Sequence, residues 1–348
     1  MSDLPQGLLR DDVPRRPSFT VSERPHRAKL DQNESPFDVP AEAKERILAD
    51  LRAAAWNRYP QPRWYAEVKE RFAAAIGQRP ERLVLTAGCD QMILLAFWAA
   101  GGRGRRARVF EPTYPMFGHY ARTTQTELDS VVLGADFEMR AEVLGDPVEL
   151  LCLVSPNNPT GGGPERALVV EALRREGLVF VDEAYADYAG QSIVDLVPGS
   201  PGLLVGRSLA KSLLAGTRLG YGLGHPEVIA ALERLLFVPY HLSSFQLLVA
   251  YHFELIQPHL ASRVAAVVAE RGRVAAGIAA LGLRVWPSRA NFVLFAVPDA
   301  RRTHERLLDQ GVRLRDVSSM PGLSNHLRAT VGTAEENERF LAALARAL

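Results

Sequence analysis

Lys211 is the residue whose type and position most strongly suggest covalent chemistry. The 348-residue sequence has 41 lysines and arginines together, of which only Lys29, Lys44, Lys69 and Lys211 are lysines. Lys211 lies in the mostly small and apolar segment 206–224. Arginine keeps its proton at any ordinary pH, whereas a buried lysine can lose its proton and form a Schiff base with a carbonyl compound. Lys211 is therefore a candidate nucleophile, and the alternative is an ordinary surface charge.

Asp182 and Tyr185 are candidate partners for a ring that such a lysine could hold. In the segment VFVDEAYADY, residues 179–188, Asp182 ends a very apolar run, where an unpaired carboxylate is costly. A cationic ring nitrogen would satisfy this carboxylate, and Tyr185, three residues later, could serve the same ring. In isolation Asp182 could equally be a helix N-cap, and Tyr185 a packed aromatic residue.

Gly88, Cys89 and Asp90 form a candidate anion site. The segment TAGCDQMILLAF, residues 86–97, reads as a strand, a glycine turn and the start of an apolar helix. The free amide groups at a helix start can bind a phosphate, although a glycine before a helix is commonly only a turn. A lysine, a ring acid and a phosphate cradle are the partners that pyridoxal phosphate requires.

Buried strands must position these residues. Val- and Leu-rich runs alternate with amphipathic stretches such as residues 165–176, a pattern that predicts a mainly parallel sheet covered by helices on both faces. The predicted strands are RLVLTAG, RARVFEP, ELLCLVSP, GLVFVDEAY, GLLVGRS and RLGYGLG. Ligands of such sheets bind at the carboxyl ends of the strands, which is where the candidate residues fall. The sequence therefore predicts an α/β fold with one converging site.

The length favours a large domain plus a smaller one. A long helix is expected over 259–281, followed by strands in 283–297, 312–317 and 326–332, with helices in 302–311 and 334–348. We predict an N-terminal segment, 1–44, that packs with the small domain, a large domain, 45–255, and a small α/β domain, 256–348.

The bulk composition points to small-molecule partners. The formal net charge of +1 gives no general attraction to nucleic acid or anionic lipid. The sequence shows no secretory signal, no membrane-spanning run, no CxxC pair and no metal-ligand spacing among its histidines. We therefore expect a cytoplasmic protein with no metal, no membrane and no nucleic-acid partner.

Taken in order, the motifs resemble those of fold-type I pyridoxal-phosphate-dependent aminotransferases of class I/II, and within them the histidinol-phosphate branch. The resemblance runs over nearly the whole chain and is carried by LDQNESPF, NRYPQP, TAGCDQ, PTYPMFGHYA, SPNNPTG, VDEAYADYA, SLAKSLLAGTRLGYGLG, PYHLSSFQ, PSRANFVLF, GVRLRD and PGLSNHLRATVGTAEEN. It implies a large cofactor-binding domain, a smaller α/β domain and a homodimer with shared active sites. It also implies amino transfer from histidinol phosphate, a small-molecule amino donor, to 2-oxoglutarate, a 2-oxo acid.

The resemblance also implies roles for individual residues. Lys211 would hold the cofactor and move a proton, and Asp182 would keep the ring nitrogen protonated. Asn158 and Tyr185 would contact the ring oxygen, and Tyr114 would stack on the ring. The cofactor phosphate would be held by Gly88, Cys89, Asp90, Ser208, Arg218 and the partner subunit's Tyr59. Arg328 would bind the substrate carboxylate, and Arg315 the substrate phosphate.

The sequence departs from the family pattern around Lys211. Ala210 stands where serine or threonine is common, and the spacing from Lys211 to Arg218 is one residue shorter than usual. An aromatic amino acid aminotransferase, a threonine-phosphate decarboxylase-like enzyme and a non-catalytic pyridoxal-phosphate-binding paralogue stay open as alternatives. The only support for a dinucleotide-binding dehydrogenase is the loose glycine run GGRGRR, residues 101–106. This run precedes its strand, whereas the dinucleotide-binding motif follows a strand.

Overall fold

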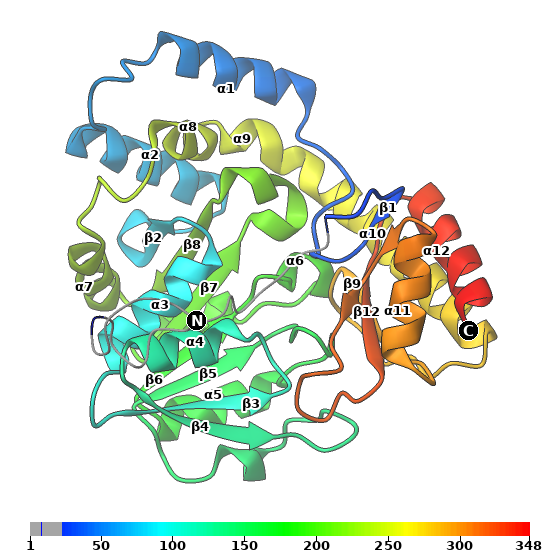
Figure 1. Ribbon diagram of the computed structural model, residues 1–348. Coiled ribbons are helices and arrows are strands. Elements are labelled where there is room, and N and C mark those ends of the chain that lie inside the picture. The colour runs from blue at the N-terminus through cyan, green and yellow to red at the C-terminus, as the bar shows by residue number, and fades with distance from the viewer. Residues whose placement is uncertain (1–7, 9–22) are drawn as a thin grey trace.

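The large sheet has seven strands and forms the centre of the molecule (Figure 1). The computed structural model describes residue 8 and residues 23–348. In spatial order the strands are β2 (Leu83–Thr86), β8 (Gly220–Gly224), β7 (Leu203–Ser208), β6 (Leu178–Asp182), β5 (Leu150–Val154), β3 (Arg106–Glu111) and β4 (Glu127–Val132). Of these, β8 runs against both neighbours, and the pairs among β3 to β7 are parallel. The predicted mainly parallel α/β fold is confirmed.

The central strands are buried on both faces, which explains their nearly continuous apolar sequences. On β5, Leu151 and Leu153 pack into one core cluster, and Leu150 and Cys152 pack into the other. The second cluster is covered by α3 (Cys89–Ala100), α4 (Met116–Thr123) and α7 (Pro226–Leu236). The first is covered by α1 (Ala41–Ala53), α2 (Pro62–Ala75), α5 (Arg166–Arg175), α8 (Ser244–Tyr251) and α9 (Phe253–Ile256).

Strand β4 is absent from the predicted strands. It lies at the edge of the sheet beside β3, and every residue of its sequence, ELDSVV, is exposed or half-buried. An edge strand needs no continuous apolar run, so the pattern that predicts buried strands misses it.

A second, smaller group of elements surrounds a three-stranded antiparallel sheet. Its strands are β11 (Arg315–Asp316), β12 (His326–Thr330) and β9 (Phe292–Ala296), and α11 (Ala300–Asp309) and α12 (Ala334–Ala347) pack with them. Residues 283–291, expected to be strand, contribute only an isolated bridge from Val285 to Phe295.

The N-terminal segment and a long helix link the two groups of elements. β1 (Ala28–Lys29) pairs with β10 (Val312–Arg313) of the smaller group. α10 (Leu260–Ala280) contacts α6 (Ala186–Ala189) of the larger group as well as β9 and α12 (Figure 1). The predicted domain boundaries stay predictions. Among the described helices, none has the length and apolarity needed to cross a membrane.

Candidate active site

A pocket of about 490 Å³ opens at the carboxyl ends of the parallel strands. Ten of the thirteen predicted site residues line it: Cys89, Asp90, Tyr114, Asn158, Asp182, Tyr185, Ser208, Lys211, Arg218 and Arg328. Parallel strands end at one edge of their sheet, so residues distant in sequence meet there. Of the other three, Gly88 adjoins the pocket, whereas Tyr59 and Arg315 lie outside its lining.

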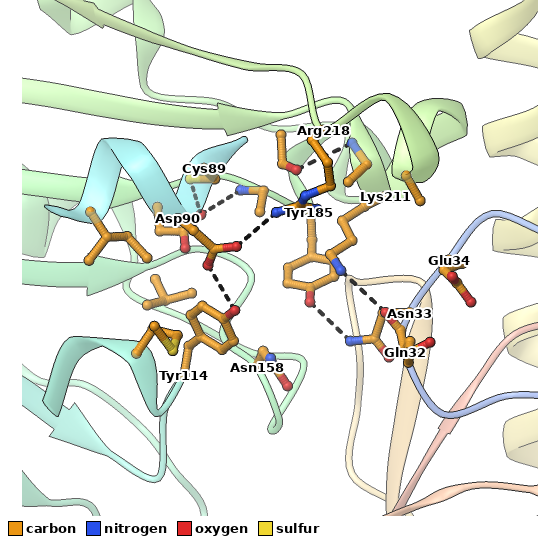
Figure 2. Close-up of a pocket in the computed structure, with 18 of the residues that line it drawn as sticks. Gln32, Asn33, Glu34, Cys89, Asp90, Tyr114, Asn158, Tyr185, Lys211 and Arg218 are labelled. Carbon is orange, nitrogen blue, oxygen red and sulfur yellow. Dashed lines mark hydrogen bonds and ion pairs between the residues drawn. The ribbon is translucent and has the colours of Figure 1, made fainter. Parts of the chain in front are cut away.

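Lys211 extends from a π-helical turn, Ala210–Leu214, that follows β7. Its Nζ donates a hydrogen bond to the backbone oxygen of Gln32, 3.2 Å away (Figure 2). Its own backbone oxygen accepts a hydrogen bond from the Tyr188 hydroxyl at 2.7 Å. Burial, aided by the positive charge of Arg328, lowers the pKa of Lys211 to about 8. A neutral amine is therefore accessible near physiological pH.

Asp182 lies at the end of β6, with its carboxylate inside the protein. Its Oδ1 accepts hydrogen bonds from the backbone N–H of Ala184 at 2.9 Å and from the thiol of Cys89 at 3.3 Å. Burial raises the pKa of Asp182 to about 6, and these two hydrogen bonds oppose that shift. No lysine or arginine side chain pairs with Asp182 among the described residues, so a cationic ligand atom would find an acid there.

The start of α3 forms the candidate phosphate cradle. Gly88 has a φ of +85°, a conformation that favours glycine, and a Cβ at this position would lie 3.0 Å from Nη2 of Arg218. Gly220 has a similar role, since a Cβ at residue 220 would lie 2.9 Å from the backbone nitrogen of Cys89. The guanidinium of Arg218 can thus approach the free amide groups at the helix start.

Arg218 reaches this cradle despite the short spacing from Lys211. A 3-10 turn, Ala215–Thr217, follows the π-helical turn, and Arg218 itself has a left-handed backbone with a φ of +53°. Its Nη2 lies 3.0 Å from Oδ2 of Asp90, whose Oδ1 accepts a hydrogen bond from the Tyr114 hydroxyl at 2.8 Å (Figure 2). With this turn geometry the guanidinium of Arg218 lies beside the start of α3.

The N-terminal segment contributes residues for which sequence reasoning proposed no role. Gln32, Asn33 and Glu34 line the pocket. Asn33 is buried with a φ of +55°, and its Nδ2 donates to the Tyr185 hydroxyl at 3.0 Å (Figure 2). Asparagine tolerates this left-handed conformation better than most residues. The motif LDQNESPF was a signal for this segment, but not for a contact with Tyr185, 152 residues away.

Arg328 on β12 is buried and points toward the same pocket. Its guanidinium donates to Oδ1 of Asn158 and to the backbone oxygen of Asp31, and its Nε has no hydrogen-bond partner among the described residues. Burial lowers the pKa of Arg328 to about 10, and the charge of Arg315 adds to this effect. Arg315 sits opposite Arg328 in the antiparallel pairing of β11 and β12 and lines a second pocket.

Tyr59 lies on the loop between α1 and α2 and is 76% exposed. Its ring contacts that of Tyr240 at 5.5 Å, and Tyr240 in turn contacts the exposed Phe237. Trp56, on the same loop as Tyr59, is also exposed. The four residues Trp56, Tyr59, Phe237 and Tyr240 are called the aromatic patch below.

Comparison with known proteins places this chain in a protein family. The family model for aminotransferase class I and II matches residues 25–344. The chain belongs to this family. The predicted enzyme class, a pyridoxal-phosphate-dependent aminotransferase, and its cofactor are therefore confirmed, and its reactants are small molecules, an amino donor and a 2-oxo acid.

Individual relatives are similar to this chain over most of their length. The histidinol-phosphate aminotransferase of Chlorobaculum tepidum is 33% identical over 327 residues, which cover 90% of this chain and 92% of that protein. Histidinol-phosphate aminotransferase 1 of Carboxydothermus hydrogenoformans is also 33% identical, with 92% and 93% covered. The crystal structure of histidinol-phosphate aminotransferase from Sinorhizobium meliloti in complex with pyridoxal-5'-phosphate has a TM-score of 0.81 at 23% identity, covering 93% of this chain and 91% of that one.

Covalent uptake of pyridoxal phosphate is expected to depend on pH through Lys211. Below about pH 8 the amine is mostly protonated, and its nucleophilic fraction falls about tenfold for each further pH unit. The rate at which the apoprotein develops the visible absorbance of the bound cofactor should therefore rise with pH up to about 8 and then level off. Stopped-flow absorbance measures this rate, and a continued rise to about pH 10 would contradict the lowered pKa.

Proposed function

We propose that the chain transfers the amino group of L-histidinol phosphate to 2-oxoglutarate, which gives imidazole acetol phosphate and L-glutamate in histidine biosynthesis. The observation that carries this proposal is the pairing of Arg315 with Arg328 on neighbouring strands. Cross-strand neighbours project from the same face of a sheet. Arg315 lines the second pocket, and its charge still acts on the guanidinium of Arg328. Two guanidinium groups suit a phosphorylated amino donor, because a phosphate carries more charge than the single carboxylate of an ordinary amino acid. The names of the two bacterial relatives support the same substrate.

The residues of the pocket fit pyridoxal phosphate. The buried carboxylate of Asp182 has no cationic side chain as partner among the described residues. The cradle at Gly88 lies beside the guanidinium of Arg218, and a Cβ at residue 220 would lie 2.9 Å from its Cys89 backbone nitrogen. Lys211 is a lysine with a lowered pKa. These are an acid for the ring nitrogen, donors for the phosphate and an amine for the aldehyde.

Different side chains of the pocket would then take different parts in the reaction. When bound, pyridoxal phosphate supplies an aldehyde that condenses with amines and a ring that withdraws electrons. Asp182 would hold a proton on the ring nitrogen, and Lys211 would accept and return a proton at Nζ. Tyr185 and Asn158 would contact the ring oxygen, and Tyr114 the ring face. Arg328 and Arg315 would bind the substrate anions. The cofactor phosphate would be bound by Gly88, Cys89, Asp90, Ser208 and Arg218.

We also propose a homodimer in which the aromatic patch is covered by a second copy. Large exposed apolar side chains that cluster on a surface are typical of a protein interface. In such a dimer the partner subunit's Tyr59 would reach the cofactor phosphate, consistent with its position outside the pocket of its own chain. Sedimentation of the purified protein tests this arrangement, and a cytoplasmic location is part of the same proposal.

The substrate proposal is tested by comparing turnover of different amino donors. The cofactor-loaded protein is incubated separately with histidinol phosphate, phenylalanine and threonine phosphate, and loss of the visible absorbance and formation of glutamate from 2-oxoglutarate are measured. Turnover should be fastest with histidinol phosphate. Turnover of phenylalanine alone, or carbon dioxide release from threonine phosphate, would contradict the proposal in favour of an alternative activity, and a bound cofactor without any transfer would indicate a non-catalytic paralogue.

Replacing Arg315 should separate the two substrates. Arg315→Gln is expected to raise the KM for histidinol phosphate about tenfold or more, since a charge-assisted contact to phosphate is lost. The KM for glutamate in the reverse half-reaction should change less. Arg302→Gln, which removes an exposed arginine of α11, is the matched control and should change neither. Equal KM values for wild-type and Arg315→Gln protein would remove the support for a phosphorylated donor.

A further inference from the structure

Cys89 is the pocket residue whose contact the proposed function leaves unexplained. It begins α3, directly after Gly88, and is 7% exposed. Its Sγ lies 3.3 Å from Oδ1 of Asp182, across a sequence separation of 93 residues. The chain has one other cysteine, Cys152, which is buried on β5.

The neighbourhood keeps the Cys89 side chain against Asp182. Gly206 on β7 pairs with Asp182 on β6, and a Cβ at residue 206 would lie 3.0 Å from Sγ of Cys89. The missing side chain thus leaves room for the sulfur. Desolvation raises the pKa of the Cys89 thiol well above its usual value, and the charge of Asp182 raises it further. The sulfur therefore keeps its proton and can donate it to the carboxylate.

The two donors to Asp182 converge on one oxygen. The Cys89 thiol and the Ala184 N–H both donate to Oδ1, and Oδ2 makes no hydrogen bond with the described residues. A donor on Oδ1 stabilises the ionised carboxylate and limits its rotation. The first effect favours a proton on a ligand nitrogen beside Oδ2 over a proton on the carboxylate itself, and the second keeps the orientation of Oδ2 fixed.

We propose that Cys89 is a positioning residue for the cofactor: its thiol holds Asp182 ionised and oriented, so that Oδ2 stays available to the cofactor's ring nitrogen. This inference rests on the proposed role of Asp182. It assigns the side chain of Cys89 a role separate from that of its backbone amide, which belongs to the phosphate cradle. A purely structural Cys89 would only fill space at the start of α3.

Three single variants separate these roles through the dissociation constant for pyridoxal phosphate, measured by titration of the apoprotein. Cys89→Ala removes the donor and should weaken binding about three- to tenfold, because a thiol is a weak donor but its acceptor is charged. Cys89→Ser keeps a donor and should stay within about twofold of wild type. Cys152→Ala, the matched control, should bind like wild type. If Cys89 only filled space, serine would be no better than alanine.

Infrared spectroscopy of the apoprotein tests the hydrogen bond itself, without cofactor or activity. In the Cys152→Ala background the S–H stretching band comes from Cys89 alone, and it should lie at lower frequency than in Cys152→Ala/Asp182→Asn, where the acceptor has no charge. An unchanged band, or an equal cofactor affinity of wild type and Cys89→Ala, would overturn the inference. A wild-type chain that binds no pyridoxal phosphate would instead overturn the proposed function, and this inference with it.

Discussion

Lys211→Arg is expected to abolish turnover, with a fall in kcat of at least about 10⁴-fold, and to abolish the visible absorbance of the bound cofactor. Arginine fits the charge of the site but cannot become a neutral amine at any pH at which the protein is folded. The amine of Lys211 can do so, because burial lowers its pKa to about 8. The variant should therefore lose the covalent attachment and the proton transfer together.

The matched control for this variant is Lys69→Arg. Lys69 is also largely buried, and its Nζ pairs with Glu233 at 2.7 Å, a contact that arginine can replace. Its absorbance and activity should match those of the wild type. Steady-state kinetics and an absorbance spectrum of each variant suffice, and a fall in kcat much smaller than about 10⁴-fold in Lys211→Arg would refute the role of this lysine.

Asp182→Asn should reduce kcat about 10²- to 10³-fold and weaken cofactor binding. The amide cannot keep a proton on the ring nitrogen, so the ring withdraws electrons less effectively. The apoprotein, in contrast, should gain stability. A pKa raised from 3.8 to about 6 means that the folded state disfavours the charged carboxylate, so stability falls as pH rises through this interval, and at neutral pH the cost is up to about 3 kcal/mol.

Thermal unfolding of the apoprotein and kinetics of the loaded protein test this pair of opposite effects. An increased Tm with lost activity is the expected combination, because the buried carboxylate of Asp182 lowers the stability of the folded apoprotein but is needed for the reaction. A decreased Tm of the apoprotein would indicate that Asp182 is a structural residue, and full activity of the variant would contradict its proposed contact with the ring.

Much of the site follows from the sequence because strand ends are readable in it. The apolar runs that become β5, β6 and β7 are buried on both faces, and each stops where polar residues begin. Parallel pairing then brings Asn158, Asp182 and Lys211 to one edge without any further information. At these positions the residue types and the strand order both predict the same site.

The contacts that the sequence did not predict depend on tertiary geometry. The hydrogen bond from Asn33 to Tyr185 joins the N-terminal segment to the large sheet, and no local pattern encodes it. The approach of Arg218 to Asp90 results from successive turns and a left-handed residue, which the spacing from Lys211 does not predict. The cross-strand position of Arg315 likewise required the register of β11 against β12.

Attachment of the cofactor to Lys211 is the central claim, and reduction followed by peptide mapping tests it most directly. The protein is loaded with pyridoxal phosphate, reduced with borohydride and digested with trypsin. Cleavage after Arg207 and Arg218 should release a peptide of residues 208–218 that carries the added mass on Lys211. The same mass on Lys29, Lys44 or Lys69, or on no peptide, would contradict the account.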